Sequence, residues 1–201
     1  MITPYNVKCG IATYSRDLMR ALAELGHEIY VVRFPRFGVK NDAIMENLAN
    51  RVPVDKIDLI HMQHEYGLTQ KFDESLYRGL MRLNKPIVTT AHTMGDFKRD
   101  SMMYNSSSKV IVHNKFCKRI FGYNPTIIPH GCKSIEPIPR DEAKEKLGID
   151  PRVKIVGYCG FISETKGLED LISAMVGLKN TGLMIGGGWF VGPDTSYIAR
   201  L

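Results

Sequence analysis

Short apolar runs alternate with stretches of helical periodicity along this 201-residue chain. Runs of β-branched and other apolar residues predict strands at 29–34, 57–62, 86–91, 109–113, 126–129, 153–159 and 182–186. Apolar positions spaced three and four apart predict helices at 12–25, 41–50, 72–83, 114–121, 140–147 and 167–178. Buried parallel strands are continuous apolar runs joined by helices, so this order predicts an α/β fold built around a parallel sheet.

A proline-rich stretch divides this pattern into two parts. Residues 129–140 (PHGCKSIEPIPR) hold three prolines, which is typical of a linker. We therefore expect one domain at 1–139 and a second domain at 140–201. The second part has room for two strands, whereas a complete doubly wound domain takes about 100 residues or more, so we expect it to be incomplete. The short apolar run at residues 1–4 likewise predicts a shortened first strand.

Composition and charge exclude several classes of protein. Hydrophobic residues make up 44% and charged residues 24% of the chain, a balance typical of globular rather than disordered proteins. The net charge is +6, but the basic residues form small scattered groups, so we expect no nucleic-acid partner. No apolar run approaches the ~20 residues of a membrane-spanning helix, and the N-terminus lacks the pattern of a secretory signal. The four cysteines show no CxxC spacing and are expected to be free thiols in a reducing cytoplasm.

Two segments have the composition of a phosphate-binding turn. In residues 6–12 (NVKCGIA), Gly10 lies just before a predicted helix, whose free N–H groups suit a phosphate. The alternative is a glycine that only the turn requires. In residues 157–167 (GYCGFISETKG), Lys166 stands at the start of another predicted helix, where a cation and exposed amides suit a pyrophosphate. The alternative there is a capped helix with a surface lysine.

A glycine run follows the last predicted strand. Gly186, Gly187 and Gly188 are expected to end that strand and to allow a ligand to approach the backbone closely. The sequence contains neither GxxxxGK[ST] nor GxGxxG at these segments, so it does not predict a P-loop nucleotide hydrolase and lends little support to a nicotinamide cofactor.

Polar side chains stand where two neighbouring predicted strands end. His61, His64 and Glu65 lie in HMQHEYG, and His92 lies in TTAHT. Ligands of open parallel sheets bind outside the carboxyl ends of the strands, so these residues are candidates for a polar active-site wall. A metal site is disfavoured because His61 and His64, three apart on a strand, point to opposite faces. His92 could donate a hydrogen bond or shuttle a proton, and the alternative is a structural histidine that caps the strand end.

Together these segments resemble the retaining glycosyltransferases of the GT-B fold, family 4. The segments that carry the resemblance follow the order of that family and span essentially the whole chain: CGIATYSRDLMRALAELGHEIYVV, DLIHMQHEYGL, KPIVTTAHT, VIVHN, IIPHG and VGYCGFISETKGLEDLISAM. The resemblance implies two Rossmann-like domains, an acceptor domain at 1–139 and the start of a nucleotide-sugar donor domain at 140–201. It also implies sugar transfer with retention and without a metal ion or other cofactor, in agreement with the lack of a DxD triplet.

The resemblance implies a role for each candidate residue near the donor. His92 matches the catalytic-site histidine that reaches the donor sugar near the reacting carbon, and Gly10 matches the glycine-rich loop that faces the donor phosphates. Lys166 matches the lysine that neutralises the departing diphosphate, where a fixed cation contributes most.

The remaining candidates match peripheral parts of the family's site. His64 and Glu65 match a segment on the acceptor side. Gly186 and Gly187 match a glycine turn near the nucleotide. These roles, like those of the donor-side residues, follow from the resemblance alone.

Two departures from the family pattern bear on activity. Phe161 stands where many members have an arginine, which removes one of two phosphate-binding cations. The family's pair of glutamates with the spacing E-x7-E is absent from the chain given, and Glu142 and Glu145 have the wrong spacing and location. We therefore expect weak or no transferase activity from this chain alone.

The expected function is transfer of a sugar from a nucleotide-sugar donor to a glycan or lipid acceptor. Two alternatives stay open: a non-catalytic binding or assembly module with a glycosyltransferase fold, and another nucleotide-binding α/β enzyme. A completing subunit or self-association is a further expected partner. The expected location is the cytoplasm, with peripheral contact to a membrane as an open expectation.

Overall fold

The computed structural model describes residues 1–34, 41–189 and 195–201, and the chain divides into two compact units. Unit 1 comprises Met1–Lys133 and unit 2 comprises Ser134–Leu201. The division falls inside the proline-rich stretch at 129–140, a few residues before the position chosen from the sequence. Each unit is described by itself below.

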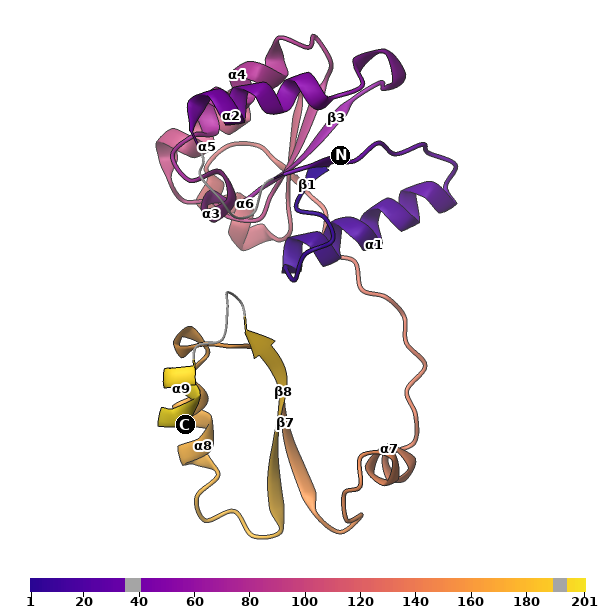
Figure 1. Ribbon diagram of the computed structural model, residues 1–201, viewed down its shortest axis with the longest axis vertical. Helices are drawn as coiled ribbons and strands as arrows, with labels where there is room; N and C mark the ends of the chain where they lie inside the picture. The colour runs from indigo at the N-terminus through magenta and orange to yellow at the C-terminus, as the bar shows by residue number, and fades with distance from the viewer. Residues whose placement is uncertain (35–40, 190–194) are drawn as a thin grey trace. The chain divides into compact units, whose positions relative to one another are not determined.

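Unit 1 is built around a parallel sheet, in which Figure 1 labels β1 and β3. The sheet has six strands in the order β2-β1-β3-β4-β5-β6. The strands are β1 (Ile2–Thr3), β2 (Val32–Arg33), β3 (Ile60–His64), β4 (Ile87–Ala91), β5 (Lys109–Val112) and β6 (Thr126–Ile127). From β1 the chain adds β2 on one side and the later strands, beginning with β3, on the other side. The topological switch point of the sheet therefore lies between β1 and β3. The expected α/β fold is thus confirmed, and it is Rossmann-like in general character.

The helices of unit 1 follow most of the predicted helical stretches. They are α1 (Gly10–Glu24), α2 (Asp42–Asn47), α3 (Tyr66–Thr69), α4 (Asp73–Met81), α5 (Phe97–Asn105) and α6 (Lys115–Phe121), with 3-10 turns η1 (Leu48–Arg51) and η2 (Val54–Lys56). Helix α5 was not predicted, because its sequence FKRDSMMYN is largely polar and buries few apolar residues. Its start is fixed by Asp96, whose side chain accepts a hydrogen bond from the Arg99 backbone N–H.

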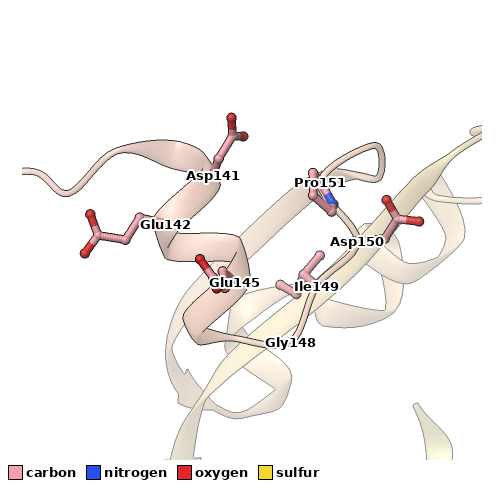
Figure 2. Close-up of a pocket in the computed structure, with 7 residues that line it drawn as sticks. All are labelled: Asp141, Glu142, Glu145, Gly148, Ile149, Asp150 and Pro151. Carbon is pink, nitrogen blue, oxygen red and sulfur yellow. The ribbon is translucent and has the colours of Figure 1, made fainter.

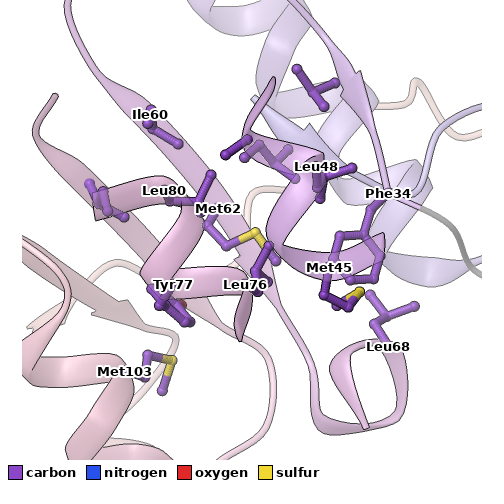
Figure 3. Close-up of a cluster of buried hydrophobic side chains, with 14 of the residues drawn as sticks. Phe34, Met45, Leu48, Ile60, Met62, Leu68, Leu76, Tyr77, Leu80 and Met103 are labelled. Atoms are coloured by element: carbon purple, nitrogen blue, oxygen red, sulfur yellow. The ribbon is translucent and has the colours of Figure 1, made fainter. Parts of the chain in front are cut away.

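The main hydrophobic core lies between the sheet and helices α2 and α4 (Figure 3). Ile60 and Met62 of β3 are buried there beside Leu76 and Leu80 of α4. Alternate residues of a strand share a face, and residues four apart share a helix face, so this pairing follows from the two periodicities. This core packs against the strands whose carboxyl ends carry His64 and His92.

Unit 2 contains a parallel pair of strands, β7 (Lys154–Ile162) and β8 (Thr181–Trp189). Its helices are α7 (Arg140–Lys146), α8 (Leu168–Ala174) and α9 (Thr195–Arg200), with the 3-10 turn η3 (Glu164–Lys166). The buried ammonium group of Lys144 donates hydrogen bonds to the carbonyls of Pro151 and Val153, which ties α7 to the start of β7. Tyr197 of α9 is buried and donates to Glu169 of α8 over 2.8 Å. Among the described residues, no helix is long and apolar enough to cross a membrane.

Candidate functional site

Three histidines gather at the carboxyl edge of the unit 1 sheet. His92 follows β4, His113 follows β5 and His130 lies just beyond β6, so neighbouring parallel strands deliver them to the same edge. The ring centroids of His113 and His130 are 3.7 Å apart, and that of His92 is 5.2 Å from His113 and 6.0 Å from His130. We call these three residues the histidine cluster.

Tyr14 joins the first part of helix α1 to the histidine cluster. Its ring makes edge contacts with the rings of His92, His113 and His130, at centroid distances of 5.0, 5.4 and 5.0 Å. Tyr14 lies four residues after Gly10, about one helical turn. These contacts therefore bring the N-terminal end of α1 close to the histidine cluster.

A hydrogen-bond chain fixes the His92 ring. Its Nε2 lies 2.9 Å from Oε1 of the fully buried Gln63, whose Nε2 lies 3.2 Å from Nε2 of His61. That His61 nitrogen also lies 2.8 Å from the hydroxyl oxygen of Thr90. Because an amide oxygen only accepts, Nε2 of His92 donates, and its Nδ1 keeps a lone pair.

The environment keeps the imidazoles of His61 and His92 neutral. Burial lowers the pKa of His61 to about 4. Burial, together with the neighbouring His113 and His130, lowers the pKa of His92 to about 3. Near neutral pH, His92 is therefore a hydrogen-bonding group with a free lone pair, which favours ligand binding over proton shuttling.

His113 also has one ring nitrogen engaged and one unpaired. Its Nδ1 donates to the carbonyl of Ile128 over 3.0 Å, while its Nε2 is buried without a hydrogen-bond partner in the described part of the chain. Burial lowers the pKa of this imidazole. An unpaired buried acceptor costs free energy, on the order of 1–3 kcal/mol, unless a ligand satisfies it.

Gly10 begins α1 and is exposed. A Cβ added there would meet no atom within 4 Å, and the backbone is not left-handed, so the protein's own atoms do not require glycine. The N-cap residue Cys9 makes no capping bond through its side chain, and the first turn has no acidic residue. The positive end of the helix dipole is thus left open to an anion.

His64 and Glu65 make structural contacts. His64 is completely buried, and its Nε2 lies 2.6 Å from a carboxylate oxygen of Asp73, whose other oxygen accepts from Arg99 over 2.6 Å. Glu65 caps α3 by accepting from the Leu68 backbone N–H over 3.0 Å. The acceptor-side role implied by the resemblance stays a prediction for both residues.

In unit 2, Lys166 is exposed at the end of η3. Its ammonium group makes no hydrogen bond or ion pair with the residues that the structure describes. The following helix α8 has seven residues and carries Glu169 and Asp170 in its first turn. Those two carboxylates disfavour an anion at the start of the helix, whereas the Lys166 ammonium favours one. The predicted pyrophosphate site therefore has one favourable and two unfavourable charges.

The prediction that the glycine run ends the last strand is wrong. Gly186 and Gly187 lie within β8, which continues to Trp189, and they pair with Cys159 and Gly160 of β7. A Cβ on Gly187 would lie 1.9 Å from the Gly160 carbonyl oxygen, so strand packing already requires glycine there. Their expected place near the nucleotide stays a prediction.

Each unit has a hollow lined by described residues. One, of about 530 Å³, lies between α7 and the loop that follows it (Figure 2) and is lined by Asp141, Glu142, Glu145 and Asp150 among others. Four carboxylates disfavour a phosphate there. The other, of about 490 Å³, lies along α1 in unit 1, and it is lined by Tyr14 together with Ile128, Pro129, Gly131, Cys132 and Lys133 among others. Because Tyr14 also contacts the histidine cluster, this second hollow adjoins the candidate site.

Sequence reasoning found His92 but did not single out His113 or His130. Each of the three follows an apolar run, so the same signal could have found them.

Comparison with protein-family models and with curated proteins gave no match to this chain.

Proposed function

We propose that unit 1 binds a nucleotide sugar at the carboxyl edge of its sheet and takes part in retaining sugar transfer to a glycan or lipid acceptor. One observation carries the proposal: Tyr14 holds the open N-terminus of α1 beside His92, whose Nδ1 lone pair is free. A helix N-terminus suits a diphosphate, and a neutral imidazole suits a sugar hydroxyl. In this proposal the N-terminus of α1 binds the diphosphate of the nucleotide sugar, and His92, which follows β4, binds its sugar.

Each group has a definite part in this proposal. Backbone N–H groups near Gly10 bind phosphate oxygens, and Nδ1 of His92 accepts a hydrogen bond from a hydroxyl of the donor sugar. The role that the resemblance implies for Lys166, to stabilise charge on the departing diphosphate, stays a separate prediction for unit 2. The transfer so described uses no metal ion.

Calorimetric titration of the full chain with UDP-, GDP- and ADP-sugars tests the proposal. We expect one of these donors to bind, and His92→Ala to weaken that binding at least tenfold by removing the sugar contact. His27→Ala is the matched control, because His27 is exposed and lies outside the site. No heat with any donor from folded protein, or equal binding by His92→Ala, would contradict the proposal. Turnover of the bound donor would exclude the alternative of a non-catalytic binding module.

A further inference from the structure

Each member of the histidine cluster brings one ring nitrogen near a nitrogen of the other two. One potential ligand atom from each of His92, His113 and His130 lies within 4.8 Å of the others. The hydrogen bonds that pair β4 with β5, and β5 with β6, set the spacing of the strand ends that carry these residues. The sheet therefore sets where His92 and His113 lie, while His130 lies three residues beyond β6.

The hydrogen bonds around these rings engage one nitrogen of His113 and one nitrogen of His92. Donation from His113 Nδ1 to the Ile128 carbonyl fixes the tautomer in which Nε2 carries a lone pair, and that Nε2 is the buried atom without a partner in the described residues. Donation from His92 Nε2 to Gln63 leaves the lone pair on Nδ1. Histidines that ligate metals usually donate their other N–H to a carbonyl or carboxylate in this way, which fixes the ring and raises its basicity.

From this arrangement we infer that the histidine cluster binds a divalent transition-metal ion of the Zn²⁺ type, through His92 Nδ1, His113 Nε2 and the imidazole of His130. Imidazole ligands suit zinc, copper and nickel, and three protein ligands leave a fourth position for water or a ligand oxygen.

The distances require one modest movement. Zn–N bonds of about 2.0–2.1 Å in a tetrahedral site place the ligand nitrogens about 3.4 Å apart, so the cluster closes by roughly an ångström when it takes the ion. His92 and His113 are each held by a hydrogen bond, whereas His130 is exposed in the segment after β6. His130 is the ligand that moves.

This inference goes beyond the proposed function, which uses no metal. It has one consequence that rests on the proposed function: Nδ1 of His92 serves both the ion and the sugar hydroxyl. The metal ion and the nucleotide sugar then compete for the same nitrogen. Saturating Zn²⁺ weakens nucleotide-sugar binding accordingly.

Titration of the untagged full chain with Zn²⁺ alone tests the metal site. We expect one ion per chain, and His130→Ala and His113→Gln each to weaken binding at least tenfold. With Co²⁺ in place of Zn²⁺, we expect the intense visible absorption of a four-coordinate site. His27→Ala and Cys132→Ser are matched controls that keep wild-type affinity, because both residues are exposed and outside the cluster.

Three outcomes overturn the inference: no Zn²⁺ binding by the folded chain, equal loss in His27→Ala, or loss in Cys132→Ser, which would assign the ion to a thiol. Circular dichroism shows whether each variant is folded, and the exposed His130 gives the variant least prone to misfold. The Zn²⁺ titration contains no nucleotide, so its failure is distinct from failure of the proposed function.

Discussion

The hydrogen bond from His92 to Gln63 determines what this imidazole offers a ligand. With Nε2 engaged and the pKa lowered to about 3, the ring presents a neutral lone pair at Nδ1. A sequence can place a histidine at a strand end, but the partner on the adjacent strand sets the tautomer. That partner depends on the register that pairs Gln63 with Thr90.

Replacing Gly10 with alanine separates ligand binding from stability. The added Cβ meets no protein atom within 4 Å, so we expect the free energy of unfolding to stay unchanged or to rise by up to about 1 kcal/mol. The proposed function places the donor phosphates against Gly10, so it predicts that the added methyl group lowers nucleotide-sugar affinity at least tenfold. Urea unfolding and calorimetry measure the two effects, and an unchanged affinity would assign the glycine to the turn alone.

The buried carboxylate of Asp73 predicts a pH dependence of stability. Burial raises its pKa, but hydrogen bonds from His64 and Arg99 outweigh burial and leave the pKa below its ordinary value. The stabilisation is present above the unfolded-state pKa of about 3.9 and is lost as the pH falls through the lower folded-state pKa. We expect Asp73→Asn to lose about 1–3 kcal/mol at pH 7 and to show a flatter decline below pH 4.

Urea unfolding of wild type and Asp73→Asn between pH 2 and 7 checks this expectation. The control is Asp17→Asn, because Asp17 is exposed and its pair with Arg16 lies on the surface. Identical slopes for wild type and Asp73→Asn at acid pH would show that Asp73 does not carry the effect.

At the scale of elements, apolar runs located the strands of both units, while the ends of the strands were less well predicted. The strand predicted at 57–62 is observed at Ile60–His64, and the one predicted at 182–186 extends to Trp189. Strand ends depend on the neighbour with which each strand pairs, and β8 continues because β7 continues beside it. Helix α5 was missed because a capping side chain and tertiary contacts, rather than apolar periodicity, define it.

Gly79 shows how helix packing explains a residue that helix propensity disfavours. It lies inside α4, where an added Cβ would be 2.5 Å from the backbone oxygen of Glu46 in α2. Glycine therefore allows the two helices to approach closely. We expect Gly79→Ala to destabilise the chain by about 1–3 kcal/mol, despite the better helix propensity of alanine.

Chemical denaturation of Gly79→Ala measures that loss. Gly10→Ala is the matched control, since it makes the same change at a helix position with open space. A Gly79→Ala variant as stable as wild type would mean that α2 shifts without cost, contrary to this account of the packing.

At the scale of the whole molecule, the two units differ in the size of their cores. The described members of the main hydrophobic cluster all belong to unit 1. In unit 2, the buried hydrophobic residues among those described are Leu168 and Tyr197. A two-stranded sheet is marginal unless a helix covers it, so unit 2 is the less stable part.

We therefore expect two unfolding steps in urea, with unit 2 unfolding first. Hydrogen exchange should show amides of β7 and β8 exchanging faster than those of β3 and β4 under native conditions. A single transition with equal protection in both units would show that they unfold cooperatively.

The central claim is that the carboxyl edge of the unit 1 sheet binds a nucleotide sugar at His92. The most direct test is NMR of the imidazole C–H groups, in protein with ¹³C-labelled histidine, during titration with the UDP-, GDP- or ADP-sugar that binds. The account predicts that the signals of His92, His113 and His130 shift together with saturation while that of His27 does not move. Saturable binding that leaves the histidine cluster unshifted would place the ligand elsewhere and contradict the account.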